Sequence, residues 1–206
     1  MKWDPTYPQD FKQALSQSFS KEEVTQLLAK SSCPPRFIYG ALMLPTVLKY
    51  FLELPQVANV DMMPATLRGY ELSLIAEKNL PVIAPSSDPQ TLVEGMLVFG
   101  LNEQQRNRIY DVEGGLTQLV YVRVMVRQRD TLDLHNDITE MRPVDAGTFA
   151  FNGPSKAGLI PVGDTYWAVD DFLGSAFYEQ IEGHQRRDQL ERSDRNGLYW
   201  GFGAMR

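Results

Sequence analysis

The chain has 206 residues, a length typical of one domain with short terminal additions. Hydrophobic residues make up 43% and charged residues 22%, as in ordinary globular domains, which excludes disorder of the whole chain. The 20 basic and 26 acidic residues give a net charge of -6, without the basic excess of proteins that bind nucleic acid or anionic membranes. One cysteine and two histidines exclude an internal disulfide and a four-ligand zinc site of the Cys/His type.

The first residues carry an acid, Asp4, and no apolar run of signal-peptide length. No stretch approaches the roughly 20 apolar residues of a membrane-spanning helix. We therefore expect a cytoplasmic protein with neither a membrane nor a nucleic acid as partner.

Residues 1–35 are predicted to form a helical arm. Ser20 and Glu23 have the spacing of a capping box, which indicates a helix over residues 21–30. The two prolines that follow Cys33 then break the chain. We expect the arm to lie on the domain or to pair with another protein, which leaves a homodimer through the terminal segments open.

Apolar runs and alternating patterns after this arm predict a series of strands. They cover residues 36–40, 65–75, 80–85, 92–99, 120–126 and 148–151. Helices are expected after Pro45, from Asn102 through Ile109, and in a tail from about Val169. This order favours an α+β fold with a mainly antiparallel sheet or barrel.

The sequence contains no Walker loop, GxGxxG, HExxH or GxSxG motif. Cys33 is expected to be a small buried apolar residue, His135 a solvated loop residue and His184 part of a solvated helix face. These interpretations leave none of the three as the preferred catalytic residue.

Glu113 differs because it lies where a helix gives way to a strand, just before Gly114 and Gly115. Apolar Ile109 and Val112 extend the inner helix face towards it. A carboxylate shielded there would have a raised pKa, which suits proton transfer near neutrality. The same position also fits a glutamate that merely ends a helix at the surface.

Several short motifs occur in the order known from one family. The family begins with an apolar strand that runs into Tyr-Gly, followed by a Leu-x-Gly-Tyr strand and a proline-bounded strand. A Val-x-Gly strand comes next. It precedes a helix that ends in Asp-x-x-Glu-Gly, and a Tyr-x-Arg strand follows that helix. Here they are Phe37–Leu42, Leu67–Tyr70, Pro81–Pro85, Val93–Leu97, Ile109–Gly114 (with a single residue between Asp111 and Glu113) and Tyr121–Arg123. In this set the chain resembles the gamma-glutamylcyclotransferase-like family, including its plant avirulence-induced branch.

The resemblance implies a small, twisted, mainly antiparallel β-barrel with flanking helices over residues 36–178. Residues 179–206 would follow as a charged helical and aromatic tail. In this chain Ala41 replaces the serine or threonine usual in the Tyr-Gly loop, and residues 115–120 lengthen the link between Glu113 and Tyr121.

The resemblance also implies an enzyme that cyclises a gamma-glutamyl amine or amide to 5-oxoproline and releases the amine. Glu113 would be the acid/base catalyst; Tyr39, Gly40, Ala41, Leu42 and Tyr121 would bind the small-molecule substrate. No metal and no organic cofactor is expected.

Two alternatives stay open. The same cavity and glutamate could serve as a cyclase, isomerase or lyase on another small molecule, or the fold could be a binding module without catalysis.

Overall fold

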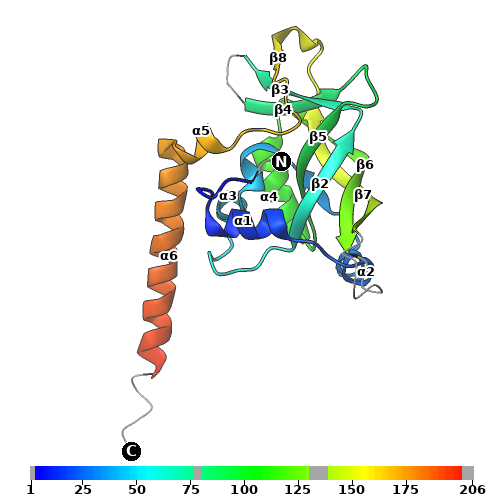
Figure 1. Cartoon of the computed structure of the whole chain (residues 1–206). Coiled ribbons are helices and arrows are strands. Elements are labelled where there is room, and N and C mark those ends of the chain that lie inside the picture. Colours follow the sequence, from blue (N-terminus) through cyan, green and yellow to red (C-terminus); the bar gives the residue numbers. More distant parts are fainter. Residues whose placement is uncertain (1–2, 77–79, 130–138, 201–206) are drawn as a thin grey trace, which may run out of the picture.

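The computed structural model describes residues 3–76, 80–129 and 139–200, with side chains only up to residue 188. Five strands close into a barrel in the order β1-β5-β2-β6-β7 (Figure 1). They are β1 (Arg36–Ile38), β2 (Met62–Arg68), β5 (Leu92–Val98), β6 (Thr117–Arg129) and β7 (Thr139–Phe151). Neighbours are antiparallel except β1 and β7, which meet in parallel where Arg36 pairs with Gly147. The expected α+β fold with a mainly antiparallel barrel is thus confirmed.

A second sheet of order β4-β3-β8 lies at one end of the barrel (Figure 1). It contains β3 (Tyr70–Ile75), β4 (Leu80–Pro85) and β8 (Leu159–Pro161). The single strand predicted over residues 65–75 is wrong, because Gly69 divides it into β2 and β3. Its φ of +74° is a backbone conformation that glycine adopts readily and other residues rarely do.

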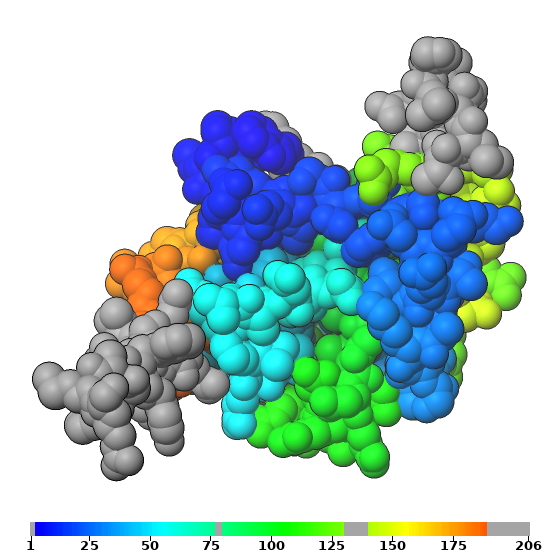
Figure 2. Space-filling model, turned by 90° about the horizontal axis from the view of Figure 1, so that it is seen from below, coloured from blue at the N-terminus to red at the C-terminus, as the bar shows by residue number. Residues whose placement is uncertain are grey.

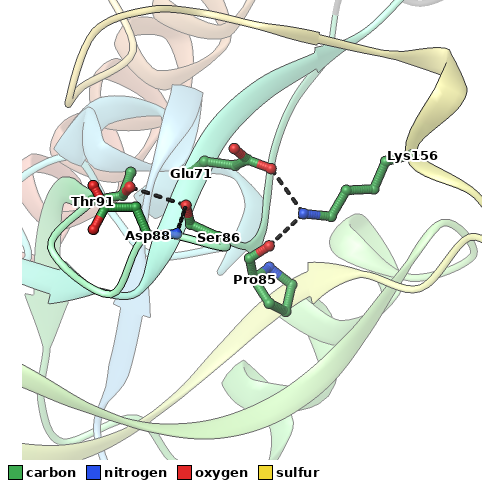
Figure 3. Close-up of polar contacts among 6 residues, drawn as sticks. All are labelled: Glu71, Pro85, Ser86, Asp88, Thr91 and Lys156. Carbon is green, nitrogen blue, oxygen red and sulfur yellow. Dashed lines mark hydrogen bonds and ion pairs between the residues drawn. The ribbon is translucent and has the colours of Figure 1, made fainter.

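Polar contacts hold the connection before β8 onto this second sheet (Figure 3). Lys156 begins the short helix η2 (Lys156–Gly158), and its Nζ lies 2.8 Å from Oε1 of Glu71 on β3. The same ammonium donates to the backbone carbonyl of Pro85 on β4. Because surface ion pairs add only about 0–1 kcal/mol, these contacts mainly fix the position of the connection.

The hairpin of β6 and β7 is longer than its sequence pattern indicates. Residues 117–129 pair with residues 139–151, where strands were expected only over 120–126 and 148–151. Residues 117–120 of the expected link therefore belong to β6. Exposed arginines at 123, 127 and 129 alternate with buried positions, so the strand continues through a sequence that looks polar.

Two hydrophobic cores stabilise the molecule. One fills the barrel and includes Phe37, Leu97 and Val124. The other lies between the barrel wall and the helices and includes Ile38, Met96 and Phe149. Alternate residues of β1 and β5 thus point into different cores, as the twofold period of a strand requires.

The described part of the chain also contains six α-helices and the short helix η1. They are α1 (Gln9–Ser16), α2 (Lys21–Ala29), η1 (Gly40–Met43), α3 (Pro45–Phe51), α4 (Glu103–Glu113), α5 (Asp170–Leu173) and α6 (Ala176–Trp200). Helix α6 packs on α3 and runs away from the barrel (Figure 1). The capping box of Ser20 and Glu23 at the start of α2 is confirmed. Helix α1 was not predicted, and α4 continues past Ile109 to Glu113.

The N-terminal segment lies across the surface of the body (Figure 2). Tyr7 and Phe11 are buried in the core between barrel and helices, whereas Trp3 is 58% exposed. Tyr7 and Phe11 thus attach the arm to the domain, one of the two arrangements expected for it. The tail aromatics Tyr199, Trp200 and Phe202 lie outside the described side chains.

No helix in the described part of the chain is both long and apolar enough to cross a membrane. Within the same residues, no three His, Cys, Asp or Glu side chains gather in a group that could hold a metal ion.

Candidate functional site

Glu113 is the last residue of α4, and the local sequence fixes this end of the helix. The helix begins at a capping box in which Asn102 and Gln105 exchange two hydrogen bonds of 2.9 Å. It ends at Gly114, whose N–H donates to the carbonyl of Tyr110 at 2.8 Å. Gly115 then adopts a φ of +97°, which turns the chain into β6.

The carboxyl group of Glu113 lies among protein atoms, although the residue as a whole is only half-buried. Burial raises the pKa of Glu113 from 4.5 to about 7. The group is therefore partly protonated and partly ionised near neutral pH. A carboxyl group in that condition can both accept and donate a proton, as acid/base catalysis requires.

Tyr39 lies close to Glu113 at the end of β1. Burial and the nearby Glu113 carboxylate both raise the pKa of the Tyr39 hydroxyl above its usual value. The hydroxyl donates to the carbonyl of Phe149 at 2.7 Å, and the nearby backbone of Ile83 partly offsets the rise in its pKa. Tyr39 is thus a neutral, fixed side chain that joins β1, β4 and β7 next to Glu113.

The loop after Tyr39 is compact and partly buried. Gly40 has a φ of +69°, and a Cβ at this position would lie 2.7 Å from Cγ of Pro81. Glycine is required here both by conformation and by the close approach of β4. Gly40, Ala41 and Leu42 form the start of η1, with Gly40 and Leu42 buried and Ala41 partly exposed.

The structure does not bring Tyr121 to this group. Its side chain is 73% exposed on the outer face of β6, while Val124 and Val126 point into the barrel. Residues two apart share a face of a strand, so Tyr121 belongs with the outward-facing Arg123. We therefore leave Tyr121 out of the proposed catalytic site.

The contribution of β4 was missed by the sequence reasoning. Pro81 packs on Gly40, and the backbone of Ile83 lies near the Tyr39 hydroxyl and lowers its pKa. The proline-bounded pattern of residues 81–85 indicated a strand, but it contained no signal that this strand would contact the Tyr39 loop.

The remaining candidates lie elsewhere. Cys33 is partly exposed, so the prediction of a buried residue was wrong; it precedes two prolines in a surface connection. His184 is exposed on α6, as expected, with its ring 5.3 Å from that of Tyr50. His135 lies outside the described residues.

A surface hollow of about 570 Å³ lies on the outer barrel wall, between the N-terminal segment and strands β2, β5 and β6. None of the predicted site residues lines it. Size alone does not mark a site, and we base the assignment on the ionisable group at Glu113 instead.

Burial of Glu113 predicts a pH-dependent stability difference between the protein and its Glu113→Gln variant. A carboxyl group whose pKa rises on folding stabilises the fold below the unfolded pKa of 4.5, and this stabilisation is lost as the pH rises through about 7. At about 1.4 kcal/mol per pKa unit, the loss is about 3 kcal/mol.

Urea unfolding should therefore show similar stability for the two proteins near pH 4.5. Above about pH 7.5 we expect Glu113→Gln to be more stable by about 3 kcal/mol. The exposed Glu103→Gln change on the same helix is the matched control and should show no such divergence. A constant difference between Glu113→Gln and the unchanged protein across this pH range would contradict the burial of the charge.

Comparison with known proteins supports the family. The family model described as "Gamma-glutamyl cyclotransferase, AIG2-like" matches residues 36–169. No curated protein matches the sequence.

Three solved structures are among those that match this chain. Two solution structures from Arabidopsis thaliana are 19% and 21% identical, cover 79% and 84% of this chain and 97% and 92% of their own, and have TM-scores of 0.47 and 0.46. A structure titled "Gamma-glutamyl cyclotransferase" is 15% identical, covers 72% of this chain and 86% of its own, and has a TM-score of 0.44. Because the family model spans most of the chain, this protein belongs to the gamma-glutamyl cyclotransferase, AIG2-like family.

Proposed function

We propose that the protein cyclises a gamma-glutamyl amine or amide to 5-oxoproline and releases the amine, with Glu113 as the acid/base catalyst. The observation that carries the proposal is the buried Glu113 carboxyl group, which interacts with Tyr39 and whose pKa burial raises to about 7. Membership in the family supports the same reaction class.

The first step is removal of a proton. The α-amine of a gamma-glutamyl substrate is an ammonium at neutral pH and cannot attack until a base takes one of its protons. The ionised form of Glu113 would accept this proton. The freed nitrogen lone pair then attacks the γ-carbonyl carbon, which closes a five-membered ring and gives a tetrahedral oxyanion.

The second step returns the proton. Protonated Glu113 would donate it to the leaving nitrogen as the carbon–nitrogen bond breaks, which releases the free amine. The ring nitrogen, which still carries two hydrogens and a positive charge, would lose one of these protons to the regenerated Glu113 carboxylate and then to solvent, which gives 5-oxoproline. A pKa near neutrality lets one group perform both transfers. Ring closure is intramolecular, and holding the substrate bent can therefore supply much of the rate acceleration.

The loop from Gly40 to Leu42 would bind the substrate's carboxylate or the developing oxyanion through backbone N–H groups. Fixed donors of this kind need no reorganisation when charge develops. The steps proposed here are proton transfers and acyl transfer only, and they invoke no metal or organic cofactor. We propose the cytoplasm as the location of the reaction.

A panel of gamma-glutamyl amines, amides and dipeptides, scored by mass spectrometry for 5-oxoproline, tests the proposal. At least one member should give 5-oxoproline and the free amine in equal amounts. The same substrate with an acetylated α-amine is the matched control and should be inert, because its nitrogen cannot attack. Formation of another product from a member of the panel would favour the alternative of a different small-molecule reaction. Binding without turnover throughout would favour a non-catalytic module.

A further inference from the structure

Arg36, the first residue of β1, is buried without a partner for its charge. Its side chain is 7% exposed, and its Nε has no hydrogen-bond acceptor. Among the ion pairs of the described residues, none involves Arg36. Buried charges in proteins are normally paired, because an unpaired one loses its hydration without compensation. This arrangement therefore requires an explanation.

The position of the guanidinium follows from the barrel register. Arg36 pairs with Gly147 on β7, and Gly147 pairs with Tyr121 on β6. The three residues form a row across neighbouring strands, in which residues directly opposite share one face. A Cβ at Gly147 would lie 2.5 Å from Nη1 of Arg36, so the guanidinium occupies the space that glycine leaves in the middle of this row.

A second cation lies near the first. Burial lowers the pKa of Arg36, and Arg106 on α4 lowers it further by repulsion. Nη1 of Arg106 donates to the carbonyl of Leu101 at 2.6 Å, which fixes this second guanidinium in place. Figure 2 shows α4, in green, bordering the blue N-terminal segment that leads into β1.

No carboxylate among the groups that act on Arg36 balances the two arginines. Apart from Arg106, these groups are Tyr121 and Cys33, neither of which is a carboxylate. Asp145 lies on the same strand face as Tyr121 but pairs with Arg123 at 3.0 Å. The site thus combines two cations, an unsatisfied donor and an exposed tyrosine.

We propose that Arg36, Arg106 and Tyr121 form a binding site for an oxyanion, the carboxylate or phosphate group of a small molecule. A guanidinium presents several N–H donors in a plane and binds both groups well. A bound oxyanion would accept the hydrogen bond that Nε of Arg36 lacks and would compensate both charges. The Tyr121 hydroxyl would contact the ligand from the exposed side. This site uses none of the residues assigned to catalysis and is independent of the proposed reaction.

Thermal unfolding in low-millimolar inorganic phosphate or acetate, against sodium chloride of equal ionic strength, tests the site. The unchanged protein should show a saturating rise in Tm, of about 3 °C when the anion reaches ten times its Kd. Arg36→Met keeps an unbranched side chain without the charge and should abolish this rise. Without anion, Arg36→Met should be at least as stable as the unchanged protein, because it removes a buried unpaired charge.

Three further variants separate the site from general effects of salt. Arg123→Met removes an exposed arginine from the same strand and should keep the full response. Tyr121→Phe and Arg106→Met should each weaken it, and Arg106→Met serves where Arg36→Met does not fold. Glu113→Gln should bind the anion normally, so loss of the proposed catalysis would leave this result intact.

The two anions identify the chemistry of the ligand. A response to phosphate alone indicates a phosphate group, and a response to both anions indicates that a carboxylate is sufficient. Equal shifts in the unchanged protein, Arg36→Met and Arg106→Met, or no shift with either anion, would overturn the proposal.

Discussion

Replacement of Glu113 by glutamine should lower kcat by about 100- to 10,000-fold, the usual cost of losing a general base. Glutamine keeps the shape of the side chain but cannot accept the proton of the substrate ammonium. The backbone of the Gly40 loop is unchanged, so substrate affinity should change much less than kcat. The measurement is the rate of 5-oxoproline formation from the substrate that the panel identifies.

Glu103→Gln on the exposed start of α4 is the matched control and should retain full activity. The unchanged protein should also lose kcat/KM as the pH falls below about 7, because protonated Glu113 cannot act as base. Circular dichroism would confirm that each variant is folded. A Glu113→Gln protein with the normal rate would remove Glu113 from the mechanism.

Replacement of Phe11 by alanine should reduce the free energy of unfolding by about 3–5 kcal/mol. Phe11 is on α1 in the N-terminal segment, yet its ring is 0% exposed and packs 5.3 Å from that of Tyr7. It belongs to the same core as Val47 and Ile181 on α3 and α6. Truncation would leave a cavity that these helices cannot easily fill.

Urea denaturation would measure this loss, with Phe177→Ala as the matched control. Phe177 is 48% exposed on α6, and its truncation should cost about 1 kcal/mol or less. If the two variants were equally stable, the N-terminal segment would be a detachable arm and not part of the folded body.

The sequence predicted the structural features that arise from residues close together in the chain, such as the starts of helices α2 and α4. The capping boxes at Ser20 and Asn102 act within one helical turn, and both helices begin where these residues indicate. Gly69 shows the limit of such signals. The alternation over residues 65–75 is real, but a single positive φ sends its two halves into different sheets.

The candidate site shows the same division. The end of α4 at Gly114 was predictable, because glycine commonly ends a helix. The apolar residues before Glu113 likewise indicated that its carboxyl group would be shielded. The position of Tyr121 was not, because the face that a strand residue occupies depends on pairing with distant strands. Arg36 gave no signal at all, since its burial arises only when β1 meets β7.

Closure of the barrel through β1 and β7 also affects how the protein meets other chains. Unpaired strand edges can recruit further strands and start aggregation, and closure removes them. Here closure depends on a single register pair, Arg36 with Gly147, supported by the hydrogen bond from the Gly147 N–H to Pro35 at 2.9 Å. Separation of β1 from β7 at this contact would leave two strand edges unpaired and would also free the Gly40 loop that follows β1. Resistance to self-association and integrity of the candidate site are therefore coupled through the first three residues of the barrel.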